Sequence, residues 1–382
     1  MYFITERDPN YTIKGSRDPL GFQALWQTAG RCVVPYLSTV SAAVRDFQIL
    51  CIGYALKKEL NITDQQFLPF FIRLEQLMAY TRFIYNKDPG FNGIERVKKK
   101  ADHTTIHISN SSEDQLMSSQ KAYGIWGKYI RPFTDIGITA DKDFDQVYLQ
   151  KVKANPQLLK YAGAFLNKSA NESNRISRNE LQQLSSLLEK PTEAERELLI
   201  KYLLQDKHEE ELLRIVQQNE GYKDGISLYS LIDSLCNESD NQSFCTSLKV
   251  IRQTERILSP LARIFRYLQT RSYWSFSDIE NDTYINKWQQ TDSDISLLQE
   301  EPVRSLAALF GQSNIDLVKC LVNRNEDVAA RRNSSPWMRF TNSGLEINHF
   351  EGAGFSADYN PDIHTDNTYF LHTFVNLYKQ LN

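Results

Sequence analysis

Apolar side chains at helical spacing run through most of the chain, and this pattern limits the folds open to it. The spacing is cleanest in residues 247–271, where at ~100° per residue one side of the predicted helix is apolar. Similar spacing occurs in residues 42–60 and 64–86. We therefore predict a mainly α-helical protein, built from helical bundles. The Ser259-Pro260 step is expected to kink or split the helix of residues 247–271.

A chain of 382 residues is too long to fold around one ordinary hydrophobic core. At roughly 100–200 residues per domain, two or three domains are expected. Breaks in the pattern suggest three consecutive parts: an N-terminal helical domain over residues 1–140, a charged helical domain over 141–225, and a C-terminal helical domain over 226–382 that ends in a hairpin and a helix.

A few short segments favour strands over helices. Residues 104–109 alternate as a strand does, inside a stretch (91–119) that otherwise indicates a loop. Residues 336–340 and 344–350 predict a β-hairpin with Thr341-Asn-Ser-Gly as its turn. The β-tending Ile136-Gly-Ile-Thr139 follows a helix around Trp126, an order typical of the end of a winged-helix module.

Composition narrows the class of protein. The chain has 44 basic and 47 acidic side chains and a formal charge of −3, which excludes a globally basic nucleic-acid binder and leaves a local basic patch open. Five cysteines without a CxxC pair indicate reduced thiols. We see neither an N-terminal signal sequence nor a membrane-length apolar run, and therefore expect a cytoplasmic protein with no membrane partner.

Two basic clusters are candidate nucleic-acid contacts. In the helix of residues 247–271 four arginines fall within about 80° of one another, opposite the apolar side. These are Arg252, Arg256, Arg263 and Arg266, called the arginine stripe below. Guanidinium groups suit phosphate because they offer paired donors. The alternative is an ordinary amphipathic helix whose arginines pair with acids in residues 193–211. The second cluster is Lys98, Lys99 and Lys100, in a predicted loop.

Motifs for catalysis are largely missing from the sequence. It contains neither a GxxxxGK[ST] phosphate loop nor a GxSxG nucleophile motif. The densest acid–base set is Asp362, His364, Asp366 and His372. A turn at Asn360-Pro361, with Asp366 or Asn367 capping a closing helix over residues 367–380, accounts for that set without a metal or an acid–base site. Catalytic residues stay unassigned, and we expect no metal and no cofactor.

Residues 15–56 carry a resemblance to a known family. The stretch Gly15-Ser-Arg-Asp-Pro-Leu-Gly-Phe22 is followed by Trp26, by Gly30-Arg31, by Val34-Pro35, by Leu37-Ser-Thr-Val40 and by Arg45-Asp-Phe47. It resembles a bacterial family of unassigned function that is encoded in phage-defence gene clusters, often beside helicases and phospholipase-D-like nucleases. In physical terms the motif indicates a structural role within the fold, because Asp18 can cap a helix that begins at Pro19.

The expected function combines the resemblance with the arginine stripe. It is a non-catalytic component of a bacterial anti-phage defence system that binds DNA or a partner subunit encoded by a neighbouring gene. One alternative is a metal-dependent nuclease or other hydrolase with dispersed carboxylates, for which Asp362, His364 and Asp366 are the cluster to test. The other alternative is a pure assembly scaffold.

Overall fold

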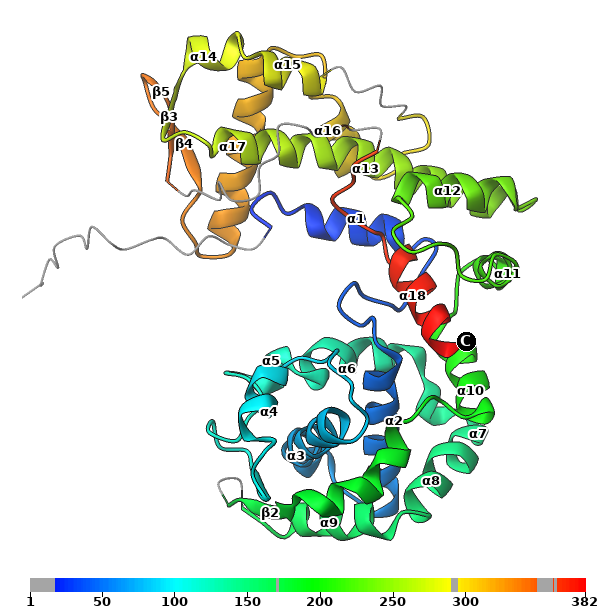
Figure 1. Cartoon of the computed structure of the whole chain (residues 1–382). Helices are drawn as coiled ribbons and strands as arrows, with labels where there is room; N and C mark the ends of the chain where they lie inside the picture. The colour runs from blue at the N-terminus through cyan, green and yellow to red at the C-terminus, as the bar shows by residue number, and fades with distance from the viewer. Residues whose placement is uncertain (1–17, 170–171, 290–294, 349–359, 361–362) are drawn as a thin grey trace, which may run out of the picture. The chain divides into compact units, whose positions relative to one another are not determined.

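A computed structural model describes residues 18–169, 172–289, 295–348, 360 and 363–382 of the chain. Within these residues it contains eighteen α-helices and five short strands (Figure 1), which confirms the mainly helical prediction. In the described part of the chain, each helix is too short or too polar to cross a membrane.

The chain forms two compact units, each assembled from separate stretches. Unit 1 comprises Met1–Val33, Lys207–Ile215 and Lys223–Leu371; unit 2 comprises Val34–Asp206, Val216–Tyr222 and His372–Asn382. Helices α11 (Glu211–Gln218) and α18 (Leu371–Leu381) contain residues of both units. The three consecutive domains inferred from the sequence stay a prediction.

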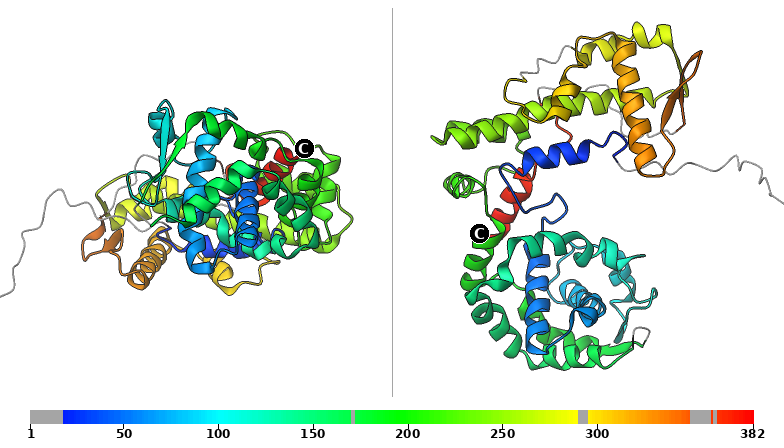
Figure 2. Two further views of the ribbon diagram at one scale, coloured as in Figure 1. Left: turned by 90° about the horizontal axis from the view of Figure 1, so that it is seen from below. Right: turned by 180° about the vertical axis from the view of Figure 1, so that it is seen from behind.

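Unit 2 is built around one buried helix, α3 (Asp64–Ile84). A capping box between Thr63 and Gln66 begins it, and buried residues, most of them apolar, lie on every side of it, as expected for a helix enclosed by others. Figure 1 shows α3 nearly end-on with its neighbours around it, and Figure 2 shows the same arrangement from behind. The other elements of unit 2 are α2 (Val44–Glu59), α4 (Ile94–Lys100), β1 (Thr105–Ile108), α5 (Gln120–Tyr123), α6 (Ile125–Ile136), α7 (Lys142–Phe144), α8 (Gln150–Lys153), α9 (Pro156–Leu166), β2 (Asn174–Ser177), a 3-10 helix (Arg178–Leu188) and α10 (Glu193–Leu203).

Two sequence expectations in unit 2 are wrong. The sequence predicts a loop around one strand for residues 91–119, yet they contain α4, whose N-cap Gly93 has a left-handed conformation. The strand is correct and pairs with β2 in an antiparallel ladder. Residues 136–139 are not a strand, because Gly137 ends α6 and a short 3-10 helix (Ile138–Ala140) follows. No winged-helix hairpin forms at this described segment.

Unit 1 is organised along α13 (Gln242–Leu268), which continues unbroken through Pro260. The proline removes one backbone donor, but buried Ile257, Leu261 and Ile264 on both sides of it hold the helix in the core. The helix is therefore not split at Ser259-Pro260, and the alternative expectation of a kink there stays a prediction. The other elements of unit 1 are α1 (Phe22–Gly30), α12 (Leu228–Asn237), β3 (Tyr273–Ser275), α14 (Phe276–Glu280), α15 (Thr283–Gln289), α16 (Glu301–Ala307), α17 (Asn314–Arg331), β4 (Met338–Phe340) and β5 (Gly344–Ile347).

The predicted C-terminal hairpin is present in unit 1. Strands β4 and β5 pair antiparallel, with Arg339 opposite Glu346, and β3 adds a third strand to β5. Gly344 is required at this junction, because a Cβ there would lie 2.3 Å from the carbonyl oxygen of Trp274. Residues 349 and 350, the expected end of the second arm, lie outside the described residues.

The closing helix begins later than its sequence suggested. Helix α18 starts at Leu371, and the backbone N–H groups of Asp366 and Asn367 donate to the Glu255 carboxylate on α13. These two residues therefore attach a loop to α13 and do not cap the last helix. Near the N-terminus α1 begins at Phe22 with Gly21 as its N-cap, so the expected helix start at Pro19 is wrong. The Asp18 carboxylate nevertheless accepts from the first backbone donors of the helix, Phe22 N and Gln23 N.

Candidate functional site

The arginine stripe lies on α13, and its first half contacts α12. Arg252 Nη2 donates to Asp233 Oδ1 at 2.5 Å and to the Tyr229 carbonyl oxygen at 3.1 Å. The Arg256 guanidinium lies over the Tyr229 ring, 5.9 Å from its centroid. Both side chains are half-buried. This half of the stripe is consequently engaged by α12.

The second half of the stripe shares a single carboxylate. Arg263 binds Asp366 in a two-pronged manner, Nη2 to Oδ1 at 2.5 Å and Nε to Oδ2 at 3.2 Å, and the Ser259 hydroxyl donates to Oδ2 at 2.8 Å. Arg266 Nη1 is 3.6 Å from Oδ1. Two positive charges thus face one negative charge, and Arg266 is the weaker partner.

The acids beside the stripe differ from those that the alternative interpretation expected. Asp233 and Asp366 approach Arg252, Arg263 and Arg266, and neither belongs to residues 193–211. Sequence spacing could not identify them, because Asp366 is about one hundred residues from the arginines it binds. Phosphate contact by the four arginines stays a prediction.

A buried carboxylate fixes the loop that carries Asp366. Glu255 accepts hydrogen bonds from Asp366 N (2.5 Å), Asn367 N (3.1 Å), Asn367 Nδ2 (2.9 Å) and the Tyr369 hydroxyl (2.8 Å). Its side chain is fully buried, and burial raises the pKa of Glu255 to about 7, with the nearby Asp366 charge acting in the same direction. Glu255 is therefore a positioning group for this loop.

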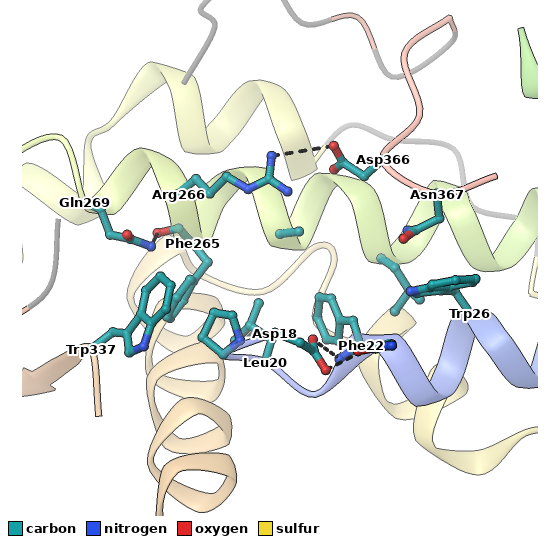
Figure 3. Close-up of a pocket in the computed structure, with 14 residues that line it drawn as sticks. Asp18, Leu20, Phe22, Trp26, Phe265, Arg266, Gln269, Trp337, Asp366 and Asn367 are labelled. Atoms are coloured by element: carbon teal, nitrogen blue, oxygen red, sulfur yellow. Dashed lines mark hydrogen bonds and ion pairs between the residues drawn. The ribbon is translucent and has the colours of Figure 1, made fainter. Parts of the chain in front are cut away.

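Between α1 and α13 lies a cavity of about 370 Å³, within unit 1. Its α13 wall runs from Leu258 to Gln269, the residue that follows the helix end, a rise of roughly 16 Å along the axis. Figure 3 shows Arg266 and Asp366 on one side of it and Asp18 and Phe22 on the other. Four aromatic rings contribute to its walls: Phe22, Trp26, Phe265 and Trp337.

The cavity combines flat apolar walls with a cation. Arg266 is about one-third exposed (34% of its side chain) and its single ion pair within the described residues is the one with Asp366. Asn367 and Gln269 add amide groups to the lining. Such a site suits a ligand with an aromatic ring and an anionic group, because the rings stack and guanidinium donors bind oxyanions.

The lysine cluster belongs to unit 2, in the last turn of α4. Lys98 pairs with Glu95 at 2.7 Å, and Lys100 Nζ donates to the Glu113 carbonyl oxygen at 2.7 Å. Lys98 and Lys99 are exposed. Positive side chains at the C-terminal end of a helix also offset its dipole. The position of these lysines therefore has a structural explanation as an alternative to the predicted nucleic-acid contact.

The acid–base cluster of the C-terminal loop is only partly described. Asp362 lies outside the described residues, His364 is exposed with its Nδ1 accepting from Asn360 N, and Asp366 is bound to arginines. Within the described part of the chain, no group of three or more His, Cys, Asp or Glu side chains is arranged to hold a metal ion. All five cysteines are free thiols.

Sequence reasoning found Arg266 and Asp366 but missed the cavity between them and α1. The lining comes from four separate stretches, residues 18–26, 258–269, 337 and 366–367. Trp26 was noticeable as an anchor of the family-like motif, and Asp18, Leu20 and Phe22 of that motif also line the cavity.

Comparison of the chain with family models, curated proteins and solved structures finds no match.

Proposed function

We propose that this chain is a non-catalytic binding component of a bacterial anti-phage defence system, and that unit 1 binds single-stranded nucleic acid. An unpaired base would enter the aromatic cavity, and a phosphate of the same strand would bind Arg266. The observation that carries the proposal is the position of Arg266, a partly exposed cation with one distant, shared counter-ion at the edge of four aromatic rings.

The charge arrangement supports an anionic ligand. Asp366 already accepts two hydrogen bonds from Arg263 and one from Ser259, so it offsets only part of the second arginine's charge. Arg266 makes no side-chain hydrogen bond to any described residue. Its N–H donors are consequently available, and guanidinium groups bind phosphate oxygens through two parallel hydrogen bonds.

The aromatic lining favours a nucleic-acid base over an aliphatic group as the part of the ligand that enters the cavity. Stacking of a base on an aromatic ring contributes about 1–3 kcal/mol and tolerates any sequence. The amides of Asn367 and Gln269 also border the cavity, where Asn367 Nδ2 donates to Glu255 and Gln269 Nε2 donates to the Phe265 carbonyl oxygen. Duplex DNA hides both faces of its bases, so an unpaired strand is the form that this cavity suits.

The family resemblance suggests the biological setting. The residues that carry it include Asp18, Leu20, Phe22 and Trp26, all of which line the cavity. The phage-defence setting rests on this resemblance alone, whereas the binding proposal rests on the geometry of unit 1.

The test is the affinity of the full chain for a labelled oligo(dT) single strand and for a duplex of the same length. Arg266→Gln keeps a polar side chain but removes its charge and its guanidinium donors, and should weaken single-strand binding about tenfold. The matched control is Lys249→Gln, which removes one charge from an exposed position of the same helix and should change affinity by less than about twofold. Equal affinity of wild type and Arg266→Gln would contradict the proposal. Stable co-purification with neighbouring gene products, without any affinity for DNA, would instead support the scaffold alternative.

A further inference from the structure

A second concave surface of unit 1 contains three arginines that the sequence analysis did not single out. It is a groove of about 580 Å³ between α1 and α17. Arg324, Arg331 and Arg332 line it from the α17 side. At ~100° per residue, positions 324, 331 and 332 fall within about 100° of one another, so one side of α17 presents all three.

Arg324 is held deep in this groove. Its Nε donates to the Leu20 carbonyl oxygen at 2.6 Å, and its guanidinium lies over the Phe22 ring, 5.4 Å from the centroid. Its Nη2 is 3.9 Å from the point that a Cβ on Gly21 would occupy, so this nitrogen lies against the start of α1. Burial lowers the pKa of Arg324, and the like charge of Arg331 lowers it further. Two guanidinium groups therefore lie close enough to repel each other.

Of the other two arginines, Arg331 leaves much of its donor capacity open to the groove, whereas Arg332 is bound to Asp18. Arg331 is exposed, donates to the Asp327 carbonyl oxygen of its own helix at 3.3 Å, and forms no ion pair with a described carboxylate. Arg332 Nη1 donates to the Asp18 carbonyl oxygen at 2.7 Å, and its Nη2 is 3.3 Å from Asp18 Oδ2. Asp18 is the one carboxylate among the described lining residues, and it is already bonded to Phe22 N and Gln23 N.

The opposite wall is small and neutral. Gly21 has φ +65°, a conformation that disfavours other residues, and a Cβ there would lie 3.1 Å from Val328 Cγ2. Ala24 and Gln27 of α1 continue this wall. This wall therefore leaves room for a ligand and offers the Gln27 amide, and its described residues include no carboxylate that would repel an anion.

The arginines could also have a purely structural role, because Arg331 and Arg332 lie at the C-terminal end of α17, where positive charge offsets the helix dipole. That role does not explain Arg324, which lies about two turns earlier with its guanidinium turned toward Gly21. Among the described residues that line the groove, three arginines face one engaged carboxylate and the far wall is neutral, which favours an anion as occupant.

We propose that the α1–α17 groove is a phosphate-binding site, formed by Arg324, Arg331 and Arg332, for a pyrophosphate group or for consecutive phosphates of a nucleic-acid strand. In the second case it deepens the function proposed above, because Asp18 and Gln23 border both the groove and the aromatic cavity. A strand whose base occupies the cavity would then place its neighbouring phosphates in the groove.

The experiment is calorimetric titration of the full chain with pyrophosphate in metal-free buffer. Wild type should bind, and Arg331→Gln, an exposed change that leaves the fold intact, should bind about tenfold more weakly. Arg324→Gln should weaken binding by a similar factor, with its fold checked by thermal unfolding. Lys319→Gln, exposed on another side of α17, is the matched control and should bind as wild type does.

The outcomes separate this proposal from the previous one. Pyrophosphate binding that is lost in Arg331→Gln but kept in Arg266→Gln supports the groove, whether or not the chain binds DNA. A parallel loss of oligo(dT) affinity in Arg331→Gln identifies the phosphates as those of a strand, and unchanged oligo(dT) affinity identifies a free phosphate compound. Failure of wild type to bind pyrophosphate, or equal binding by wild type and Arg331→Gln, would overturn the proposal.

Discussion

The buried arginines of unit 2 are engaged by several acceptors each, whereas two arginines of unit 1 border open space with partial partners or none. In unit 2, Arg82 Nη1 binds Asp46 at 2.6 Å and its Nε binds Asp88 at 2.9 Å, and Arg45 joins Asp88 at 2.7 Å. Arg73 donates to Asn174 Oδ1 and to three backbone carbonyls. In unit 1, Arg266 has one counter-ion at 3.6 Å, and Arg331 has none within the described residues.

This contrast suggests which charges serve the fold and which are open to a ligand. A buried ion pair with good geometry returns the cost of desolvating both charges, and its arginine then has little left for a ligand. A half-exposed arginine with a shared partner contributes little to stability and keeps its donors. The same residue type thus has a structural role in unit 2 and a candidate binding role in unit 1.

The largest expected effect is in unit 2. Arg82→Leu leaves Asp46 buried without its charge partner, and the free energy of unfolding should fall by about 3–5 kcal/mol. Chemical denaturation measures this change. Arg131→Ala removes a side chain that is 85% exposed and pairs with Asp135 at 3.8 Å, and it should cost less than about 0.5 kcal/mol. Similar losses in the two variants would mean that the Arg82 cluster is not structural.

The next effect concerns pH and Glu255. Its pKa is raised from 4.5 to about 7, so the stability that this group supplies is complete below about pH 4.5 and is lost as pH rises through 7. Relative to Glu255→Gln, the wild type should therefore lose up to ~3 kcal/mol of unfolding free energy over that range. Denaturation of both proteins at several pH values gives the difference.

Glu75 of unit 2 is the matched case for the same measurement. It is buried, accepts from Gln120 Nε2 and Ile125 N, and burial likewise raises its pKa to about 7. Glu75→Gln should show the same pH dependence as Glu255→Gln. A pH-independent difference from wild type would show that the carboxyl in question ionises normally in the folded protein.

A smaller difference in unfolding free energy is expected between variants of the two arginines that share Asp366. Arg263→Gln removes two hydrogen bonds, of 2.5 and 3.2 Å, from a half-buried carboxylate and should cost about 2 kcal/mol of unfolding free energy. Arg266→Gln should cost less than about 0.5 kcal/mol, because its ion pair is long and partly exposed. Equal losses in thermal or chemical unfolding would remove the basis for treating Arg266 as available to a ligand.

The sequence was sufficient for local features. Helical periodicity located α2, α3 and the apolar side of α13, and the Thr341–Gly344 turn located the β4–β5 hairpin. It failed where tertiary context decides the outcome. Ile136 and Ile138 favour a strand by propensity, yet Gly137 in a left-handed conformation ends α6 between them. At Pro260, core packing outweighed the missing backbone donor.

The candidate sites were less accessible to sequence reasoning. The arginine stripe was visible because its members share one helix, but its counter-ion Asp366 and the far wall at Phe22 and Trp26 come from distant stretches. Arg331 and Arg332 are adjacent and Arg324 is two turns away, a pattern common on solvated helices. Only the approach of Gly21 and the bonding of Asp18 turn this side of α17 into a groove.

The most direct test of the account is the salt dependence of oligo(dT) binding by wild type and Arg266→Gln. If a phosphate binds Arg266, the variant should bind about tenfold more weakly, and the slope of log affinity against log salt should be shallower by about 0.7. Lys249→Gln should reproduce the wild-type slope. An Arg266→Gln protein with the affinity and slope of wild type would contradict the central claim that the partly paired arginine of unit 1 is its ligand contact.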